Sequence, residues 1–166
     1  MGGCRLRYEA ICYPVHTGGD AMDILTIVLV AFIILETLNV VLLYTMPGST
    51  MGNAVGIFNA YPKTQQDPEI KAFVSYLINW VAGTKLIFIV LIIGIVITGT
   101  KETKIFSVIA LIFSIMTFFS QLYPSLKRMD KDHQLSPNGY SRTLAIMITS
   151  FLLVFTATVI IFFATL

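Results

Sequence analysis

Four runs of about 20 mostly apolar residues constrain the fold of this chain more than any other feature. They lie at about 24–45, 72–98, 104–123 and 142–166. A helix needs about 20 apolar residues to cross the hydrocarbon layer of a bilayer, which is about 30 Å thick. The runs are apolar on every side, whereas the strands of a membrane barrel alternate apolar and polar residues in segments of about ten. The sequence therefore predicts an all-α, integral membrane four-helix bundle.

The composition agrees with this interpretation. Of the 166 residues, 56% are apolar and 12% are charged, whereas a soluble domain has about 45–50% and about 25%. The net charge is only +2 and no run of basic residues is present, so the chain lacks the basic footprint of nucleic-acid binding. We expect the lipid bilayer to be its partner, and we exclude nucleic acid as a partner.

Capping residues at the second run predict where its helix begins. Asp67 is a good N-cap, Pro68 suits a first helical position, and Glu69 complements the positive end of the helix dipole. This helix is expected to start in water. Pro47-Gly48 is expected to end the first span, and only residues 99–102 separate the second span from the third. The second and third spans must therefore form a tight antiparallel hairpin.

Prolines also punctuate the second half of the chain. Tyr123-Pro124 is expected to end the third span, because proline does not continue a helix. Ser136-Pro137-Asn138-Gly139 has the composition of a turn, and Ser141 is a suitable cap for the fourth span.

Residues 1–21 differ from the rest of the chain, because they are polar and contain both cysteines, Cys4 and Cys12. One interpretation is an ordinary polar tail. The other is that Met22 is the natural start, since the codons of Thr17 to Ala21 can contain a bacterial ribosome-binding sequence. We therefore expect a polar tail at 1–21, native or not, followed by a four-span transmembrane domain at 22–166.

The distribution of lysine and arginine predicts the orientation, because cytoplasmic loops carry an excess of these residues. One side of the predicted bundle holds Arg5, Arg7, Lys101 and Lys104. The other side, with the two longer loops, holds Lys63, Lys71, Lys127, Arg128, Lys131 and Arg142. The sequence thus predicts a multi-pass protein of the cell membrane with both termini outside.

Two charged residues lie inside the predicted spans. Glu36 is near the middle of the first span with Asn39 on the same face, and Lys85 is near the middle of the second. A charge at this depth costs about 2.5 to 3.5 kcal/mol to insert, so it should face protein or water. Because neighbouring spans are antiparallel, Glu36 and Lys85 can meet as an ion pair. We name Glu36, Asn39, Lys85 and Gln121 as candidates for a ligand or ion pathway.

Two alternatives to the pair remain open. Trp80 and Tyr76 can mark the membrane interface, in which case Lys85 would extend its ammonium group toward water. Glu36 can also be protonated and hydrogen-bonded, since burial disfavours the charged carboxylate.

Small and polar residues recur at helical spacing on the last three spans. Small side chains let helices approach closely, and hydroxyl groups form hydrogen bonds between helices in lipid. We therefore expect helix-packing faces, or else the lining of a polar cavity, at Ser75, Asn79, Gly83, Ser107, Ala110, Ser114, Thr117, Thr149 and Thr156.

Residues 51–61 connect the first two spans and have apolar residues at helical spacing. This segment is predicted to be a short amphipathic helix in the membrane interface. The alternative, suggested by its two glycines, is a lid that folds back over a cavity.

Signatures of catalysis are scarce. We find no metal-ligand spacing, no glycine-rich phosphate loop and no nucleophile motif, so we predict no catalytic residue, metal or cofactor. Asp130-Lys131-Asp132-His133 is interpreted as a solvated turn. The sequence favours binding or transport of a small ligand or ion. The alternative is an accessory or scaffold subunit, either in a homo-oligomer or in a larger membrane complex. Convergence of the four pathway candidates would favour a ligand site, whereas polar stripes that face outward would favour a subunit interface.

Overall fold

The computed structural model describes residues 23–52 and 54–165. The elements in chain order are α1 (Ile24–Thr45), η1 (Val55–Ile57), α2 (Tyr61–Thr64), α3 (Pro68–Thr98), α4 (Lys101–Ser120), α5 (Leu122–Lys131) and α6 (Tyr140–Ala164). Four helical stretches are long and apolar enough to cross a membrane, namely α1, α3, α6 and the stretch formed by α4 and α5. The predicted all-α four-helix bundle is confirmed, while the expectations for residues 1–21 and Met22 lie outside the described residues.

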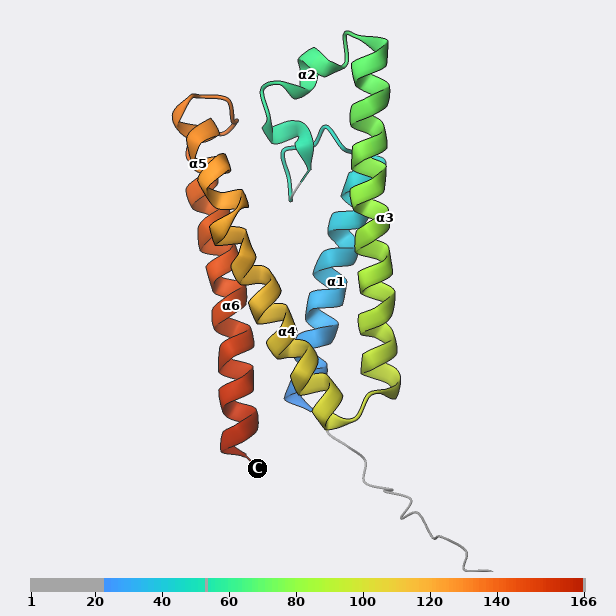
Figure 1. Ribbon diagram of the computed structural model, residues 1–166, viewed down its shortest axis with the longest axis vertical. Coiled ribbons are helices and arrows are strands. Elements are labelled where there is room, and N and C mark those ends of the chain that lie inside the picture. The colour runs from blue at the N-terminus through green and yellow to red at the C-terminus, as the bar shows by residue number, and fades with distance from the viewer. Residues whose placement is uncertain (1–22, 53, 166) are drawn as a thin grey trace, which may run out of the picture.

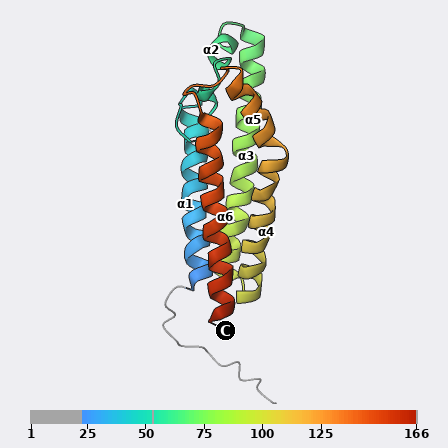
Figure 2. The same cartoon turned by 90° about the vertical axis from the view of Figure 1, so that its left-hand side faces the viewer.

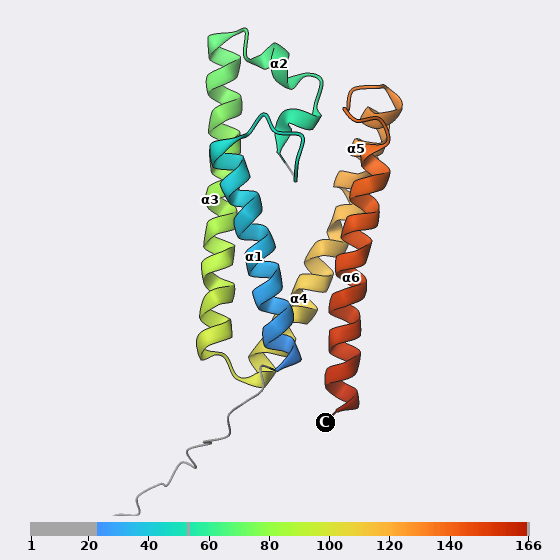
Figure 3. The same cartoon turned by 180° about the vertical axis from the view of Figure 1, so that it is seen from behind.

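The bundle is tight at one end and splayed at the other (Figure 1). Helix α1 packs along α3, while α4 starts beside α1 and leans across to end beside α6. The view from behind shows the connection between α1 and α3 filling the space between the diverging helices (Figure 3). Seen from the side, the start of α1 and the end of α6 lie at the same end, opposite the two long loops (Figure 2).

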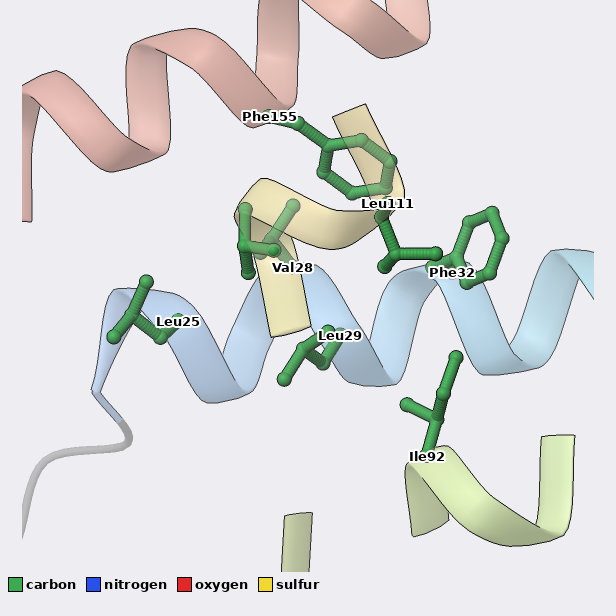
Figure 4. Packing of buried hydrophobic residues seen from close by; sticks show 8 residues of the cluster. Leu25, Val28, Leu29, Phe32, Ile92, Leu111 and Phe155 are labelled. Carbon is green, nitrogen blue, oxygen red and sulfur yellow. The ribbon is translucent and has the colours of Figure 1, made fainter. Parts of the chain in front are cut away.

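A cluster of large apolar residues closes the tight end. Leu25 and Leu29 of α1 are fully buried, and Phe155 of α6 is almost fully buried. Phe32 of α1 packs edge-on against Phe155, with 5.6 Å between the ring centroids. Figure 4 shows these side chains converging with Ile92 of α3 and residues of α4. The four helices are therefore held together at this end by apolar contacts.

The predicted N-cap of the second span, Asp67, is confirmed. The carboxylate of Asp67 accepts hydrogen bonds from the backbone N–H groups of Glu69 (2.8 Å) and Ile70 (3.2 Å). Helix α3 has 31 residues, so it is about 46 Å long at about 1.5 Å per residue. It is therefore longer than the hydrocarbon layer is thick, by about 16 Å. The tight hairpin is also present, and Thr100 caps α4 through the N–H of Thr103 (3.4 Å).

The predicted end of the third span at Pro124 is wrong. The helix axis breaks earlier, at Gln121, and a new helix, α5, continues to Lys131. Pro124 is the third residue of α5. A proline is tolerated there because the N–H groups of a first helical turn have no partner within the helix.

The predicted cap of the fourth span is also wrong. Helix α6 begins at Tyr140 behind Gly139, and Ser141 lies inside its first turn. The carboxylate of Asp130 performs the capping instead. It accepts hydrogen bonds from the N–H groups of Gly139 (2.9 Å) and Ser141 (3.0 Å) and from the Ser141 hydroxyl (2.6 Å). The sequence 130–133 is therefore more than a solvated turn, because one of its acids fixes α6 to α5.

The connection between α1 and α3 follows the lid interpretation, not that of a three-turn interfacial helix. We call residues 46–52 and 54–60 the returning loop. Ala54 and Ile57 are buried, and Ile57 packs against Leu126 of α5 and Leu144 of α6. Its carbonyl accepts a hydrogen bond from the N–H of Ser136 (2.8 Å). The loop is thus anchored to the other half of the molecule.

Glycine permits this folding back. A Cβ atom built on Gly56 would overlap the backbone carbonyl of Gly48. The two turns of the returning loop can approach this closely only because residue 56 has no side chain.

Candidate functional site

An ion pair joins α1 and α3 near the middle of the bundle. The Nζ atom of Lys85 donates to Oε2 of Glu36 at 2.5 Å, and the two side chains are 26% and 23% exposed. The pair expected from the sequence is therefore present. Trp80 is 62% exposed on α3, but Lys85 turns to Glu36 instead of extending toward an interface. The two opposite charges thus compensate each other within apolar helices, where an unpaired charge is costly.

A cavity of about 270 Å³ adjoins this pair on the side of α6. Glu36 and Asn39 form its polar wall on α1. The rest is apolar and comes mainly from α1, from Ile115 of α4 and from Met147 and Phe151 of α6. Phe32, whose ring rests on Phe155, lies at the end nearest the tight cluster. The cavity thus combines a small polar patch with a large apolar surface, which is the usual composition of a ligand site.

The polar wall contains an unsatisfied acceptor. The Oδ1 atom of Asn39 is buried and accepts no hydrogen bond from any described residue. Buried polar atoms are nearly always hydrogen-bonded, to protein, to water or to a ligand. Asn39 therefore places a buried acceptor without a partner at the wall of the cavity.

The returning loop covers the cavity through Gly52. This glycine has φ +61°, and a Cβ built on it would lie 3.8 Å from Oδ1 of Asn39 and 3.3 Å from Cδ1 of Leu42. The Tyr140 hydroxyl of α6 donates to the Gly52 carbonyl at 3.0 Å. Gly52 is thus held against the polar wall by a residue from a distant part of the chain.

A second cavity, of about 370 Å³, continues from the first along α1 and α6. The two share Phe32, Leu35, Met147 and Phe151. Leu35 and Met147 are 48% and 41% exposed, so this space opens on the lipid-facing surface between the two helices. The apolar second cavity therefore adjoins the cavity that Asn39 lines.

The fourth pathway candidate lies elsewhere. Gln121 is exposed at the break between α4 and α5 and does not line the cavity. Glu36 and Asn39 thus line the cavity, and Lys85 is joined to Glu36 by the ion pair without lining the cavity itself.

The small residues of α4 point away from the bundle. Ala110, Ser114 and Thr117 are exposed and Ser107 is partly exposed, whereas Val108 and Leu111 are buried. The hydroxyls of Ser107 and Thr117 donate within the helix, to the carbonyls of Thr103 and Ser114. The inner face of α4 is therefore apolar.

Most of the small residues named on α3 and α6 are exposed. Ser75 and Asn79 are exposed and line a separate groove. Gly83 lies near the Tyr44 hydroxyl, 3.8 Å from a Cβ built on the glycine. Thr149 and Thr156 are exposed on α6.

Sequence reasoning missed Tyr140, Met147 and Phe151, and it considered Gly52 only as part of a lid. The glycine in the connection was the one available signal, because its position suggests a close approach of the backbone. No local pattern indicates that Tyr140 would bind it from 88 residues away.

The site contains no arrangement typical of a metal centre. Among residues 23–52 and 54–165, no three His, Cys, Asp or Glu side chains come together as metal ligands. Comparison of the chain with protein-family models, with curated proteins and with solved structures gives no match. The function must therefore be argued from the geometry of the site itself.

Proposed function

We propose that this small polytopic membrane protein binds a small, mostly apolar ligand that carries one hydrogen-bond donor. The observation that supports this proposal is the buried, unsatisfied Oδ1 atom of Asn39 in the wall of a cavity of about 270 Å³. A hydroxyl or N–H group on the ligand would satisfy this acceptor. The apolar part of the ligand would lie against Met147 and Phe151 of α6.

The ion pair bears on which ligand charge suits the cavity. Lys85 offsets the carboxylate of Glu36, so the cavity offers acceptors without a net negative charge. A neutral ligand therefore suits the site better than a free cation. The apolar cluster around Leu29 and Phe155 closes the tight end of the bundle, which favours binding from the bilayer over passage along the helix axis.

Photolabelling tests this proposal. The probe is a long-chain alcohol that carries a diazirine group, added to the protein in lipid nanodiscs, and labelled peptides are identified by mass spectrometry. We expect labelling of the peptide that contains Met147 and Phe151, and a large decrease in the Asn39→Leu variant. Asn79→Leu is the matched control, because Asn79 lies outside the cavity. Equal labelling of the wild type and Asn39→Leu would contradict the proposal.

A second candidate function is that of a subunit in a homo-oligomer or a larger membrane complex. It is favoured by the outward position of Ala110, Ser114 and Thr117 on α4, because small residues allow another helix to approach closely. Replacing Ser114 by phenylalanine should then dissociate the assembly, as measured by light scattering in detergent. If the wild type has the mass of a monomer, self-association is excluded. If the wild type is an oligomer and the variant keeps its mass, this face of α4 is not the interface.

We further propose that the protein lies in the cell membrane with both termini outside and both long loops in the cytoplasm. The excess of lysine and arginine on the loop side supports this orientation. A reporter that is active only in the cytoplasm should be silent when fused to the carboxyl end. Strong reporter activity there would reverse the orientation.

A further inference from the structure

A polar groove of about 320 Å³ lies between the end of α1, α2 and the first turns of α3, and it shares no lining residue with the ligand cavity. We call it the interface groove. Figure 1 shows α2 lying beside this part of α3. Its polar residues are Tyr44, Tyr61, Gln65, Lys71, Ser75 and Asn79. Its apolar residues, among them Leu43 and Ile78, lie where α1 and α3 pack together.

Aromatic residues place the interface groove at the depth of lipid headgroups. Tyr76 and Trp80 are 64% and 62% exposed on α3, beside the groove residues Ser75 and Asn79. Tyr44 is 47% exposed in the last turn of α1. Tyrosine and tryptophan concentrate at membrane–water interfaces, where their rings are apolar and their polar atoms reach water. The phosphates of a bilayer lie at this same level.

One wall of the groove is a row of hydrogen-bond donors. Lys71, Ser75 and Asn79 follow one another at intervals of four residues and so share one face of α3. The one ion pair among the described residues joins Lys85 and Glu36, which leaves the Lys71 ammonium without a carboxylate. Other helical hydroxyls, such as those of Thr84 and Thr98, donate to the carbonyl four residues earlier, whereas Ser75 makes no such bond within the described part of the chain.

The charges around the groove favour an anion. No acidic side chain lines it. Asp67 at the start of α3 is occupied with two backbone N–H groups at the helix cap, and Glu69 in the first turn does not line the groove. An ammonium group flanked by hydroxyl and amide donors is suited to the oxygens of a phosphate.

We propose that the interface groove binds the phosphate-bearing headgroup of an anionic membrane lipid. The ammonium of Lys71 holds the phosphate, Ser75 and Asn79 donate to its oxygens, and Tyr44 and Tyr61 border the headgroup. The acyl chains extend from the groove into the bilayer. This site is separate from the ligand cavity and does not depend on the function proposed above.

Native mass spectrometry of the full chain in detergent tests this inference. The probes are phosphatidylglycerol, phosphatidylcholine and inorganic phosphate, each added separately. We expect phosphatidylglycerol to remain bound to a larger fraction of the protein than phosphatidylcholine. The Lys71→Gln variant should lower its affinity by about fivefold, the effect of one lysine near an anionic surface.

Lys63→Gln is the matched control, because it removes the same charge at the same end of the molecule but outside the groove. It should bind phosphatidylglycerol as the wild type does. Ser75→Ala combined with Asn79→Ala provides a second test that keeps the charge, and it should also weaken binding. Equal losses of phosphatidylglycerol binding in the Lys63 and Lys71 variants would overturn the inference. Inorganic phosphate that binds to as large a fraction of the protein as phosphatidylglycerol would also overturn it.

Discussion

Breaking the Glu36–Lys85 ion pair from one side should cost far more stability than removing it entirely. At the 2.5 Å separation of Nζ and Oε2, the attraction is roughly 6 to 7 kcal/mol for an effective dielectric constant of about 20. Desolvation of the two charges costs several kcal/mol for each ion, so the net contribution of the intact pair is small. Removing one partner leaves the other uncompensated, at a cost of about 3 to 5 kcal/mol.

The test is a double-mutant cycle of Glu36→Gln and Lys85→Met, with thermal unfolding in detergent followed by circular dichroism. Each single variant should unfold at least 6 °C lower, since about 3 kcal/mol corresponds to roughly 6 to 12 °C for a chain of this size. The double variant should recover much of this loss, with a coupling energy of about 2 to 3 kcal/mol.

Lys104→Met is the control for this cycle. Lys104 donates to the neutral Thr26 hydroxyl at 2.9 Å, so its removal leaves no buried charge behind. The effects of Glu36→Gln and Lys104→Met should add, because the two sites are separate. Additivity within about 0.5 kcal/mol in the Glu36–Lys85 cycle itself would refute our argument that the two charges compensate each other.

Three further predictions concern the returning loop and the start of α6. Gly56→Ala should lower stability by about 1 to 3 kcal/mol because its Cβ would overlap the Gly48 carbonyl. Its control is Gly94→Ala, which has open space around it and should raise stability by about 0.5 to 1 kcal/mol. Chemical denaturation measures both variants. Gly52→Ala should destabilise the loop by about 1 to 2 kcal/mol because of its positive φ, and unchanged hydrogen exchange at residues 54–58 would count against this. Asp130→Ala should cost about 1 to 2 kcal/mol through loss of the α6 cap, whereas Asp132→Ala, at an exposed position, should be close to neutral in the same denaturation assay.

The sequence alone determined the spans, their order and the residues that cannot face lipid. Apolar runs long enough to cross a bilayer have few alternatives to a helix, because every backbone polar group must be satisfied inside the segment. The same cost applies to Glu36 and Lys85, so their depth predicted a pair as one of the arrangements that keep these charges away from lipid. The start of α3 was also predictable, because Asp67 acts on N–H groups only two and three residues away.

The tertiary structure decided which face of each helix points inward. Small residues such as Ser114 and Thr117 permit close packing but do not require it, since their hydroxyls can donate within their own helix. The bulky side chains of Leu111 and Phe155 fixed the inner faces instead, because they fill space between segments distant in sequence. The returning loop and the roof of the cavity also depend on distant partners, as in the bond between Tyr140 and Gly52. Such contacts leave no local pattern in the chain, because each partner acquires its role only when the helices come together.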